Sequence, residues 1–188
     1  MELIIIIVAI VAMGILYYLM GSNLKELEKI AKDSELNEIA SKYPENKKIC
    51  ETILRMLGNN KTSIDEKLES DATLYIAIQN KILIGNTHQS FTRIQTIAHE
   101  CLHSIQDRKI LLFNFFYSNI YFIYWFVICI LTIFNKNMNE LIYSNILLIL
   151  SLIYYTVRVF LENDAMIKAE FVAKEYMEEQ NISSKQEI

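Results

Sequence analysis

The chain has 188 residues, of which 53% are hydrophobic and 21% are charged, with only four glycines and one proline. This composition is too apolar for an average soluble domain, and a formal net charge of -4 gives no argument for a nucleic-acid partner. It favours a membrane protein with room for one ordinary globular domain.

Three apolar runs account for the composition. Residues 3–20 and 110–134 contain no charged side chain, and residues 141–161 contain only Arg158, close to the end of the run. Each run is about as long as the roughly 20 residues that cross a bilayer as a helix. The first run lacks a basic region and a small-x-small cleavage site, so we expect a retained anchor rather than a signal peptide. The sequence thus predicts three transmembrane helices.

The basic residues predict how these helices are oriented. Residues 21–109 hold 13 of the 18 Lys and Arg, whereas the connection between the second and third runs holds only Lys136. The positive-inside rule places residues 21–109 and the C-terminal tail in the cytoplasm. The expected organisation is an anchor (1–21), a cytoplasmic domain (22–109), a transmembrane hairpin (110–161) and a cytoplasmic C-terminal helix (162–188).

Four elements are predicted within the cytoplasmic domain. A helix starts at Ser22 or Asn23 and stops at Pro44, and a second follows over 45–58, with Gly58 as its C-terminal stop. Residues 73–84 have a β-strand pattern on either side of the turn residues 79–81, which predicts a hairpin. From Ser90 the helical period returns, in a pattern compatible with a helix that runs on into the second apolar run.

This last helix carries the sequence His99-Glu100-Cys101-Leu102-His103. Residues four apart share one face of a helix, so the two histidines can reach a single ion. A catalytic zinc ion needs three protein ligands and one open position, and neutral imidazoles are good ligands. Glu100 lies off the direction of the ion, where its carboxylate can accept a proton from the attacking water and pass it to the leaving amine. The pattern predicts a zinc hydrolase; the alternative is that both histidines are polar-face residues of an interfacial helix.

A third ligand must come from elsewhere in the chain. If the second and third apolar runs form an antiparallel hairpin, the end of the third returns to the membrane surface beside the motif and brings Glu162 there. Alternatively Glu162 is a surface charge paired with Arg158 one turn earlier. Asp164 is either the competing ligand or an acceptor that orients a histidine. His88 is either a metal or oxyanion group or a simple turn residue.

The cysteines and tyrosines have simpler interpretations. Cys50, Cys101 and Cys129 cannot all pair, and the first two fall in the predicted cytoplasmic domain, which fits a reducing compartment. Cys101 is interpreted as a core residue, with a switch or metal role as the alternative, and Cys129 as a small apolar filler. No pattern assigns an oxyanion donor, and the candidates are Tyr154, Tyr155, Tyr176, Arg158 and His88.

Several stretches of the chain resemble the YugP-like neutral zinc metallopeptidases of bacterial membranes and, more distantly, the HtpX-type proteases, which are gluzincins. The similar stretches are "AHECLHSIQD", "ENDAMIKA" and "ETILRMLG", together with the N-terminal anchor. The resemblance implies His99, His103 and Glu162 as zinc ligands and Glu100 as catalytic base. It also implies supporting roles for Gln106 and Asp164.

The chain departs from these families at four places. Leu102 stands where the family has glycine, and Ser104 stands where it has alanine. Met166 takes the place of a small polar residue, or of the aspartate that fixes a histidine in HtpX-type enzymes. The family's "YDP"-like segment before the second strand is absent, unless "LYIAIQNK" stands in for it.

Together these observations predict a mainly α membrane protein with a small β-hairpin or sheet, in which a zincin-like (gluzincin) cytoplasmic domain accompanies three transmembrane helices. The expected function is a membrane-anchored, Zn2+-dependent metalloendopeptidase of the bacterial plasma membrane. It would cleave peptide or protein substrates at the cytoplasmic face of the lipid bilayer, with the edge of the hairpin adding a substrate strand.

Two other functions are weighed against this one. The first is a catalytically degenerate zincin-like membrane scaffold or partner-binding protein. The second is an intramembrane site-2-type protease, which the charges that bracket the motif disfavour, because charged groups are costly at bilayer depth. Those charges are Arg93, Asp107, Arg108 and Lys109.

Overall fold

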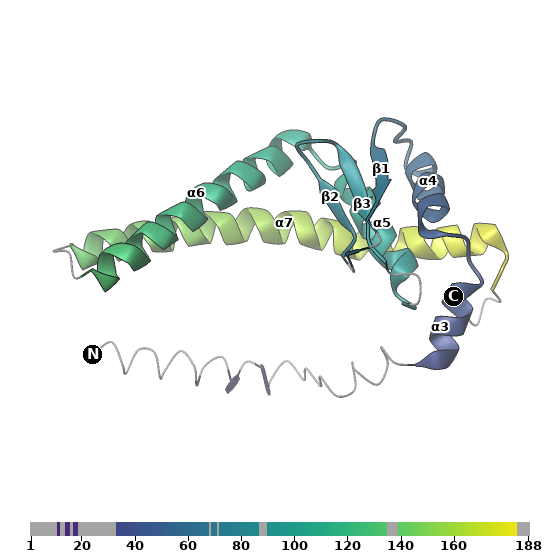
Figure 1. Ribbon diagram of the computed structural model, residues 1–188, viewed down its shortest axis with the longest axis horizontal. Coiled ribbons are helices and arrows are strands. Elements are labelled where there is room, and N and C mark those ends of the chain that lie inside the picture. Colours follow the sequence, from purple (N-terminus) through teal and green to yellow (C-terminus); the bar gives the residue numbers. More distant parts are fainter. Residues whose placement is uncertain are drawn as a thin grey trace.

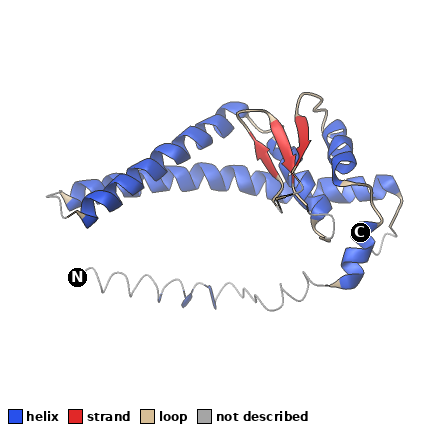
Figure 2. Cartoon of the chain, viewed as in Figure 1, coloured by secondary structure: helices blue, strands red, loops and turns tan. Residues whose placement is uncertain are grey.

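The computed structural model describes residues 11, 14–15, 17–18, 33–67, 69–70, 72–86, 90–134 and 139–183. This part of the chain is mainly helical and contains one sheet of three short strands (Figures 1 and 2). The prediction of a mainly α protein with a small β component is therefore confirmed. Most of the predicted anchor at 3–20, His88, and residues 135–138 between the second and third apolar runs lie outside the described residues.

The globular part opens with helix α3 (Ser34–Ser41). The carboxylate of Asp33 accepts hydrogen bonds from two backbone N–H groups of the first turn at 2.9 and 3.3 Å, so a new helix begins there. The prediction of one continuous helix from Ser22 or Asn23 to Pro44 is wrong, because α3 begins only after the cap at Asp33 and ends at Ser41. The part of that prediction before Asp33 lies outside the described residues.

Helix α4 (Asn46–Met56) ends as predicted at Gly58, whose φ is 69°. The N–H of Asn59 donates to the carbonyl of Leu54 at 2.8 Å and the N–H of Gly58 donates to that of Arg55 at 3.0 Å. This is a Schellman motif, which needs the left-handed backbone that glycine adopts without strain.

The sheet has the order β1-β3-β2, formed by β1 (Ser63–Glu66), β2 (Leu74–Ile76) and β3 (Lys81–Ile84). The predicted hairpin is confirmed: β2 runs antiparallel to β3, with Tyr75 opposite Ile82. Its turn occupies 77–80 rather than 79–81, and Lys81 belongs to β3. Strand β1, which pairs in parallel with β3, was not predicted, because it is short, polar and mostly exposed.

Helix α5 (Arg93–His103) forms the centre of the core and lies between the sheet and α7 (Figure 1). Its apolar side faces α4, the sheet and α7, and its fully or nearly fully buried residues are Ile94, Ile97, Ala98, Cys101 and Leu102. It does not run on into the next helix. A turn follows His103, and Asp107 caps the new helix by accepting the N–H of Lys109 at 2.7 Å.

Arg93, at the start of α5, is fully buried and joins three elements. Its guanidinium donates to the carbonyls of Ala40, Tyr43 and Pro44 and to Oδ1 of Asn46, at 2.7–3.2 Å. Because the carbonyl end of a helix carries partial negative charge, the C-terminus of α3 is a favourable place for this cation. Arg93 therefore fastens α3 and the start of α4 to the helix that carries the motif.

Helices α6 (Arg108–Ile133) and α7 (Glu140–Gln180) form the predicted antiparallel pair. The hydroxyl of Tyr117 donates to the carbonyl of Leu150, and that of Tyr124 donates to the carbonyl of Tyr143, both at 3.2 Å. Both helices are long and apolar enough to cross a membrane. Leu111 is the one residue of α6 that is buried.

Helix α7 continues without a break past residue 161, where the transmembrane hairpin was expected to end. Beyond that point it packs on α5 through a stripe of buried residues spaced three or four apart, which are Leu161, Ala165, Ala169, Ala173 and Tyr176. The small alanines allow the two helices to approach closely, and this contact positions the candidate site.

Candidate metal centre

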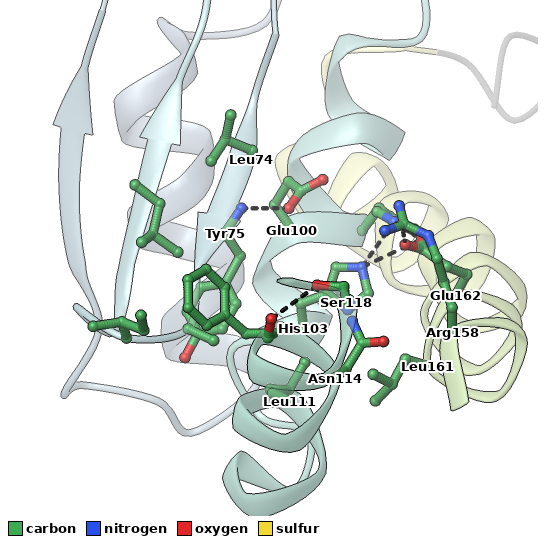
Figure 3. Close-up of a pocket in the computed structure, with 15 residues that line it drawn as sticks. Leu74, Tyr75, Glu100, His103, Leu111, Asn114, Ser118, Arg158, Leu161 and Glu162 are labelled. Atoms are coloured by element: carbon green, nitrogen blue, oxygen red, sulfur yellow. Dashed lines mark hydrogen bonds and ion pairs between the residues drawn. The ribbon is translucent and has the colours of Figure 1, made fainter. Parts of the chain in front are cut away.

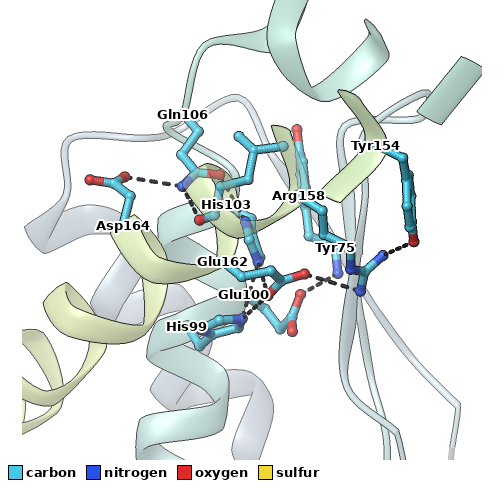
Figure 4. Close-up of polar contacts among 10 residues, drawn as sticks. Tyr75, His99, Glu100, His103, Gln106, Tyr154, Arg158, Glu162 and Asp164 are labelled. Atoms are coloured by element: carbon cyan, nitrogen blue, oxygen red, sulfur yellow. Dashed lines mark hydrogen bonds and ion pairs between the residues drawn. The ribbon is translucent and has the colours of Figure 1, made fainter. Parts of the chain in front are cut away.

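Three of the predicted site residues meet between α5 and α7 (Figure 4). His99 and His103 lie one turn apart on α5, and their Nε2 atoms are 3.1 Å from each other. Oε2 of Glu162, on α7, lies 3.3 Å from Nε2 of His99 and 3.6 Å from Nε2 of His103. These three side chains are therefore close enough to hold one metal ion.

The spacing of the three donor atoms fits zinc. Ligands that hold an ion tetrahedrally at about 2.0–2.1 Å lie about 3.3 Å from one another, and the observed separations of 3.1, 3.3 and 3.6 Å bracket that value. Two imidazoles and one carboxylate are a donor set of catalytic zinc sites, which leave a fourth position open.

The orientation of His103 is set by Gln106. The amide Nε2 of Gln106 donates to the carbonyl of Leu161 at 2.8 Å and to Oδ2 of Asp164 at 3.0 Å. Its Oε1 therefore faces Nδ1 of His103, 2.8 Å away. Since an amide oxygen only accepts, this network assigns the proton to Nδ1 and leaves the lone pair of Nε2 free for a metal ion. Asp164 thus contacts the histidine through Gln106 and lies outside the three-residue cluster.

His99 has a different environment. Burial lowers its pKa, and the neighbouring His103 lowers it further, against an opposing effect of Glu162. The neutral imidazole that a metal ion needs is therefore favoured. No hydrogen bond joins Nδ1 of His99 to any residue in the described part of the chain, and His99 and Met166 both line a cavity of about 230 Å3. The thioether of Met166 stands at the position where the resemblance implied a polar side chain.

Glu100 lies beside the cluster and points to the sheet. Its Oε2 accepts the backbone N–H of Tyr75, on β2, at 2.6 Å. Burial raises the pKa of Glu100 to about 7, against the opposing effects of His103 and of this hydrogen bond. A carboxyl group with a pKa near neutrality can both accept and release a proton at physiological pH.

A cavity of about 560 Å3 opens on these residues between β2 and the paired helices (Figure 3). Its apolar lining comes from the hairpin, α6 and α7: Leu74, Ile76, Ile78, Leu111, Phe115 and Leu161. Asn114 and Ser118 contribute polar groups from α6, and Oδ1 of Asn114 is buried without a hydrogen-bond partner in the described part of the chain. The contribution of α6 to the cavity was not predicted from the sequence. Asn114 and Ser118, two polar residues four apart in an apolar run, were a signal of it.

Glu162 also makes the alternative contact that the sequence suggested. Nη2 of Arg158 lies 3.1 Å from Oε1 of Glu162, so the carboxylate faces the histidines with one oxygen and the guanidinium with the other. Nη1 of Arg158 contacts the hydroxyl of Tyr154 at 3.5 Å. Of the candidate oxyanion donors, Tyr176 is buried in the core away from the cavity and Tyr155 is 66% exposed.

Cys101 and Leu102, between the two histidines, point into the core. The sulfurs of Cys101 and Cys50 are 3.6 Å apart, and both thiols are free and buried. This hydrogen bond and burial hold the pKa of the Cys101 thiol well above its usual range, so the thiol is neutral. Its interpretation as a core residue is confirmed, and Leu102 is accommodated in the same core.

The two helices thus define a candidate mononuclear metal centre with an adjoining carboxylic acid and cavity. Comparisons of the chain with models of protein families, with curated proteins and with solved structures find no match. The resemblance to YugP-like metallopeptidases therefore stays a prediction.

Proposed function

We propose that the chain is a membrane-anchored zinc metalloendopeptidase of the gluzincin type. The observation that carries the proposal is the grouping of His99, His103 and Glu162, with Glu100 beside them and an open cavity in front. Two helices distant in sequence provide this arrangement, and its donor spacing suits zinc. In this proposal Gln106 and Asp164 support His103.

A zinc ion, when bound, supplies Lewis-acid chemistry: it polarises a carbonyl group and acidifies water. The remaining chemistry belongs to the chain. Glu100, with a pKa near 7, accepts the proton of the attacking water and later delivers it to the leaving amine. His103 keeps its orientation through Gln106, and the apolar walls of the cavity exclude bulk water from the reacting groups.

The edge of the sheet provides a surface for an extended peptide. The N–H of Tyr75 is directed at Glu100. The backbone of Tyr75 therefore faces the cavity, on the edge of β2 that does not pair with β3. That N–H is engaged by Glu100, so a substrate strand that adds to β2 would displace the carboxylate from it, next to the reacting bond, with alternate side chains entering the apolar cavity. Peptide or protein segments with apolar side chains at the cleaved bond are the substrates that suit this lining.

The membrane arrangement extends the proposal. The exposed apolar surfaces of α6 and α7 suit lipid, and the run at 3–20 adds a third predicted span. With the basic residues concentrated in 21–109, the site lies at the cytoplasmic surface of what we propose is a bacterial plasma membrane.

Metal analysis and turnover test the proposal together. Protein purified in detergent is analysed by mass spectrometry for metal content, as wild type and as His99→Ala, Glu162→Ala and Glu100→Gln. We expect one zinc per chain in the wild type and in Glu100→Gln, and none in the two ligand variants. The control is Glu170→Ala, which removes an exposed carboxylate from α7, the helix that carries Glu162. This variant should keep the metal.

Cleavage of a casein or mixed-peptide substrate completes the test. The wild type and Glu170→Ala should be active, and Glu100→Gln inactive with its metal retained. A wild type without metal after zinc is supplied would contradict the proposal. Zinc that survives Glu162→Ala would move the third ligand elsewhere, with Asp164→Ala as the next variant.

The second candidate function is a catalytically degenerate zincin-like scaffold, favoured by Met166 beside His99. Metal binding without turnover in the wild type would support it. An intramembrane protease is less compatible with the structure, because α5 has only 11 residues, too few to span a bilayer, and packs in the globular core.

A further inference from the structure

Arg158 is the cationic side chain closest to the candidate metal centre among the residues that line the main cavity. It stands on α7 one turn before Glu162, and its guanidinium is held from two sides, by Oε1 of Glu162 at 3.1 Å and by the hydroxyl of Tyr154 at 3.5 Å. Tyr154 is in turn stacked on Tyr121 of α6, with ring centroids 5.3 Å apart. The guanidinium is therefore directed by both helices of the pair.

Two of the five N–H donors of an arginine are enough for these contacts, which leaves three for another acceptor. The side chain is 53% exposed and lines the cavity, so its unused donors are accessible to a molecule that fills this space. Arg158 is the single charged residue of 141–161. A charged side chain in an apolar segment that crosses a membrane costs free energy, so such residues commonly have a functional role.

Arg158 and Glu100 stand on different walls of this cavity. Figure 3 shows β2 with Tyr75 on one side, Arg158 and Glu162 on the other, and Glu100 and His103 between them. Glu100 is bound to the β2 side through Tyr75, whereas Arg158 belongs to the α7 side. A peptide added to β2 would thus have the general base on its sheet side and the guanidinium on its α7 side.

This placement matches the charge that develops during hydrolysis. When water adds to the peptide carbonyl, an O–C bond forms, the π electron pair moves onto the carbonyl oxygen and Glu100 takes the proton of the water. The oxyanion's electron pair then re-forms the C=O bond as the C–N bond breaks, the electron pair of that bond stays on nitrogen, and the nitrogen receives the proton from Glu100. In the intermediate between these steps the former carbonyl oxygen is an oxyanion, and a fixed donor near it lowers the barrier.

We propose that Arg158 is a catalytic residue that stabilises this oxyanion through its free N–H donors. The inference rests on the proposed peptidase function and adds to it the electrophilic group that the sequence left open among five candidates. A structural alternative is that Arg158 only holds Glu162 in place for the metal.

The two roles predict different effects on metal binding. A guanidinium at 3.1 Å from Glu162 competes with a metal ion for the negative charge of that carboxylate. Removing Arg158 should therefore leave the zinc affinity unchanged or higher if its role is oxyanion stabilisation. If Arg158 serves to position Glu162, its removal should lower the affinity.

The test compares wild type, Arg158→Ala, Arg158→Lys and the control Arg108→Ala in the full-length protein. Arg108 is a second arginine near the cleft, at the adjoining polar cavity, and makes no contact with Glu162. Three quantities are measured: zinc affinity by chelator competition, kcat and KM for an acetyl-Leu-Leu-amide-type substrate, and the affinity of the matching phosphinic peptide. The phosphinate carries the oxyanion-like charge that the substrate lacks, and the leucines suit the apolar lining.

For Arg158→Ala we expect kcat to fall by about 100–1,000-fold with KM within about 3-fold, as for the loss of one oxyanion donor. Phosphinic-peptide binding should weaken in parallel, and zinc affinity should not fall. Arg158→Lys should recover part of both losses, and Arg108→Ala should stay close to wild type. The affinity for the phosphinic peptide tests the role of Arg158 without depending on turnover.

Two results would overturn the assignment. One is an Arg158→Ala variant whose kcat and phosphinate affinity match the wild type, and the other is a loss of zinc affinity that accounts for the loss of activity. A wild type that holds zinc but neither cleaves peptides nor binds the phosphinate would instead refute the proposed peptidase function, so the two failures are distinguishable.

Discussion

The two halves of α7 differ in what surrounds them. In the first half, up to Phe160, the large apolar side chains are exposed, including Leu148, Ile149, Leu152, Tyr155 and Phe160 at 56–66%. In the second half the buried residues are small or packed on α5, and the exposed face carries several charges together with three large apolar side chains, Met166, Ile167 and Phe171. The first half needs an apolar medium that the described part of the chain does not supply, whereas the second half is an amphipathic helix that packs in a globular domain.

Glu162 is the second residue of the globular half. Its position is determined by the contact of Leu161, Ala165 and Ala169 with α5, and this contact does not depend on lipid. The candidate metal centre therefore belongs to the globular domain, although one of its residues follows directly on a predicted membrane span. We call α3–α5, the sheet and the second half of α7 the globular half of the molecule, and α6 with the first half of α7 the membrane half. Substitutions in the globular half should affect the metal centre and its stability, and the membrane half serves as the reference.

The largest effect is expected from Arg93→Ala. Four acceptors, including the carbonyls of Ala40 and Tyr43, would lose a buried cation, at a cost of about 3–5 kcal/mol in the free energy of unfolding. The measurement is maleimide labelling in urea, resolved by peptide mass spectrometry. Cys50 and Cys101 are buried in the core and report on the globular half, and Cys129, in α6, reports on the membrane half.

In that experiment the two core cysteines should react at lower urea, and Cys129 should be unaffected. Arg55→Ala, an exposed arginine on α4, is the matched control and should change the free energy of unfolding little. A shift of all three cysteines together would show that the two halves unfold as one unit.

A smaller effect is expected from Ala169→Leu. Ala169 is 1% exposed in the contact between α5 and α7, and a larger side chain there should cost about 1–3 kcal/mol by forcing the helices apart. Because this also moves Glu162 away from the histidines, zinc affinity should fall with stability. Glu170→Leu, at the next, exposed position, should leave both unchanged; an equal loss of zinc from both variants would argue against the packing explanation.

Met166→Asp should strengthen the site. A carboxylate beside His99 can accept the Nδ1 proton of that imidazole, as Gln106 does for His103, and such partners change metal affinity by about 10-fold or more. Chelator competition should show tighter zinc binding for Met166→Asp than for the control Ile167→Asp, which adds the same charge at an exposed neighbouring position. An equal gain in both variants would indicate general electrostatic attraction instead.

The smallest effect concerns protons. Glu100 has its pKa raised to about 7, so without metal this carboxyl group is mostly protonated below that pH. The positive charge of a bound ion favours the carboxylate, so zinc binding should release the proton, and zinc affinity should fall as pH decreases below 7. Calorimetry at pH 6.5 in buffers of different ionisation enthalpy should show up to one more proton released by the wild type than by Glu100→Gln. Equal proton release would mean that Glu100 is already ionised in the metal-free protein.

Sequence patterns correctly predicted those elements that are determined by residues close together in the chain. The Schellman stop at Gly58, the β2–β3 hairpin and the two long apolar helices follow from φ preferences, strand period and hydropathy. The start of α3 at Asp33 was missed, because a capping residue inside an apparently helical pattern is also an ordinary surface residue. Strand β1 was missed because its pairing with β3 comes from chain segments far apart, and its own residues are polar.

At the site, the spacing of His99 and His103 and the return of an antiparallel hairpin determined the three residues that meet, since helix geometry and chain connectivity are readable from sequence. Only the tertiary structure decided how each is supported. The packing of α7 on α5 turns Glu162 to the histidines, Gln106 orients His103, Tyr75 holds Glu100, and Arg158 faces the same cavity. These contacts join side chains up to 63 positions apart, from His99 to Glu162, through the closeness of two helix faces, and no local pattern specifies that approach.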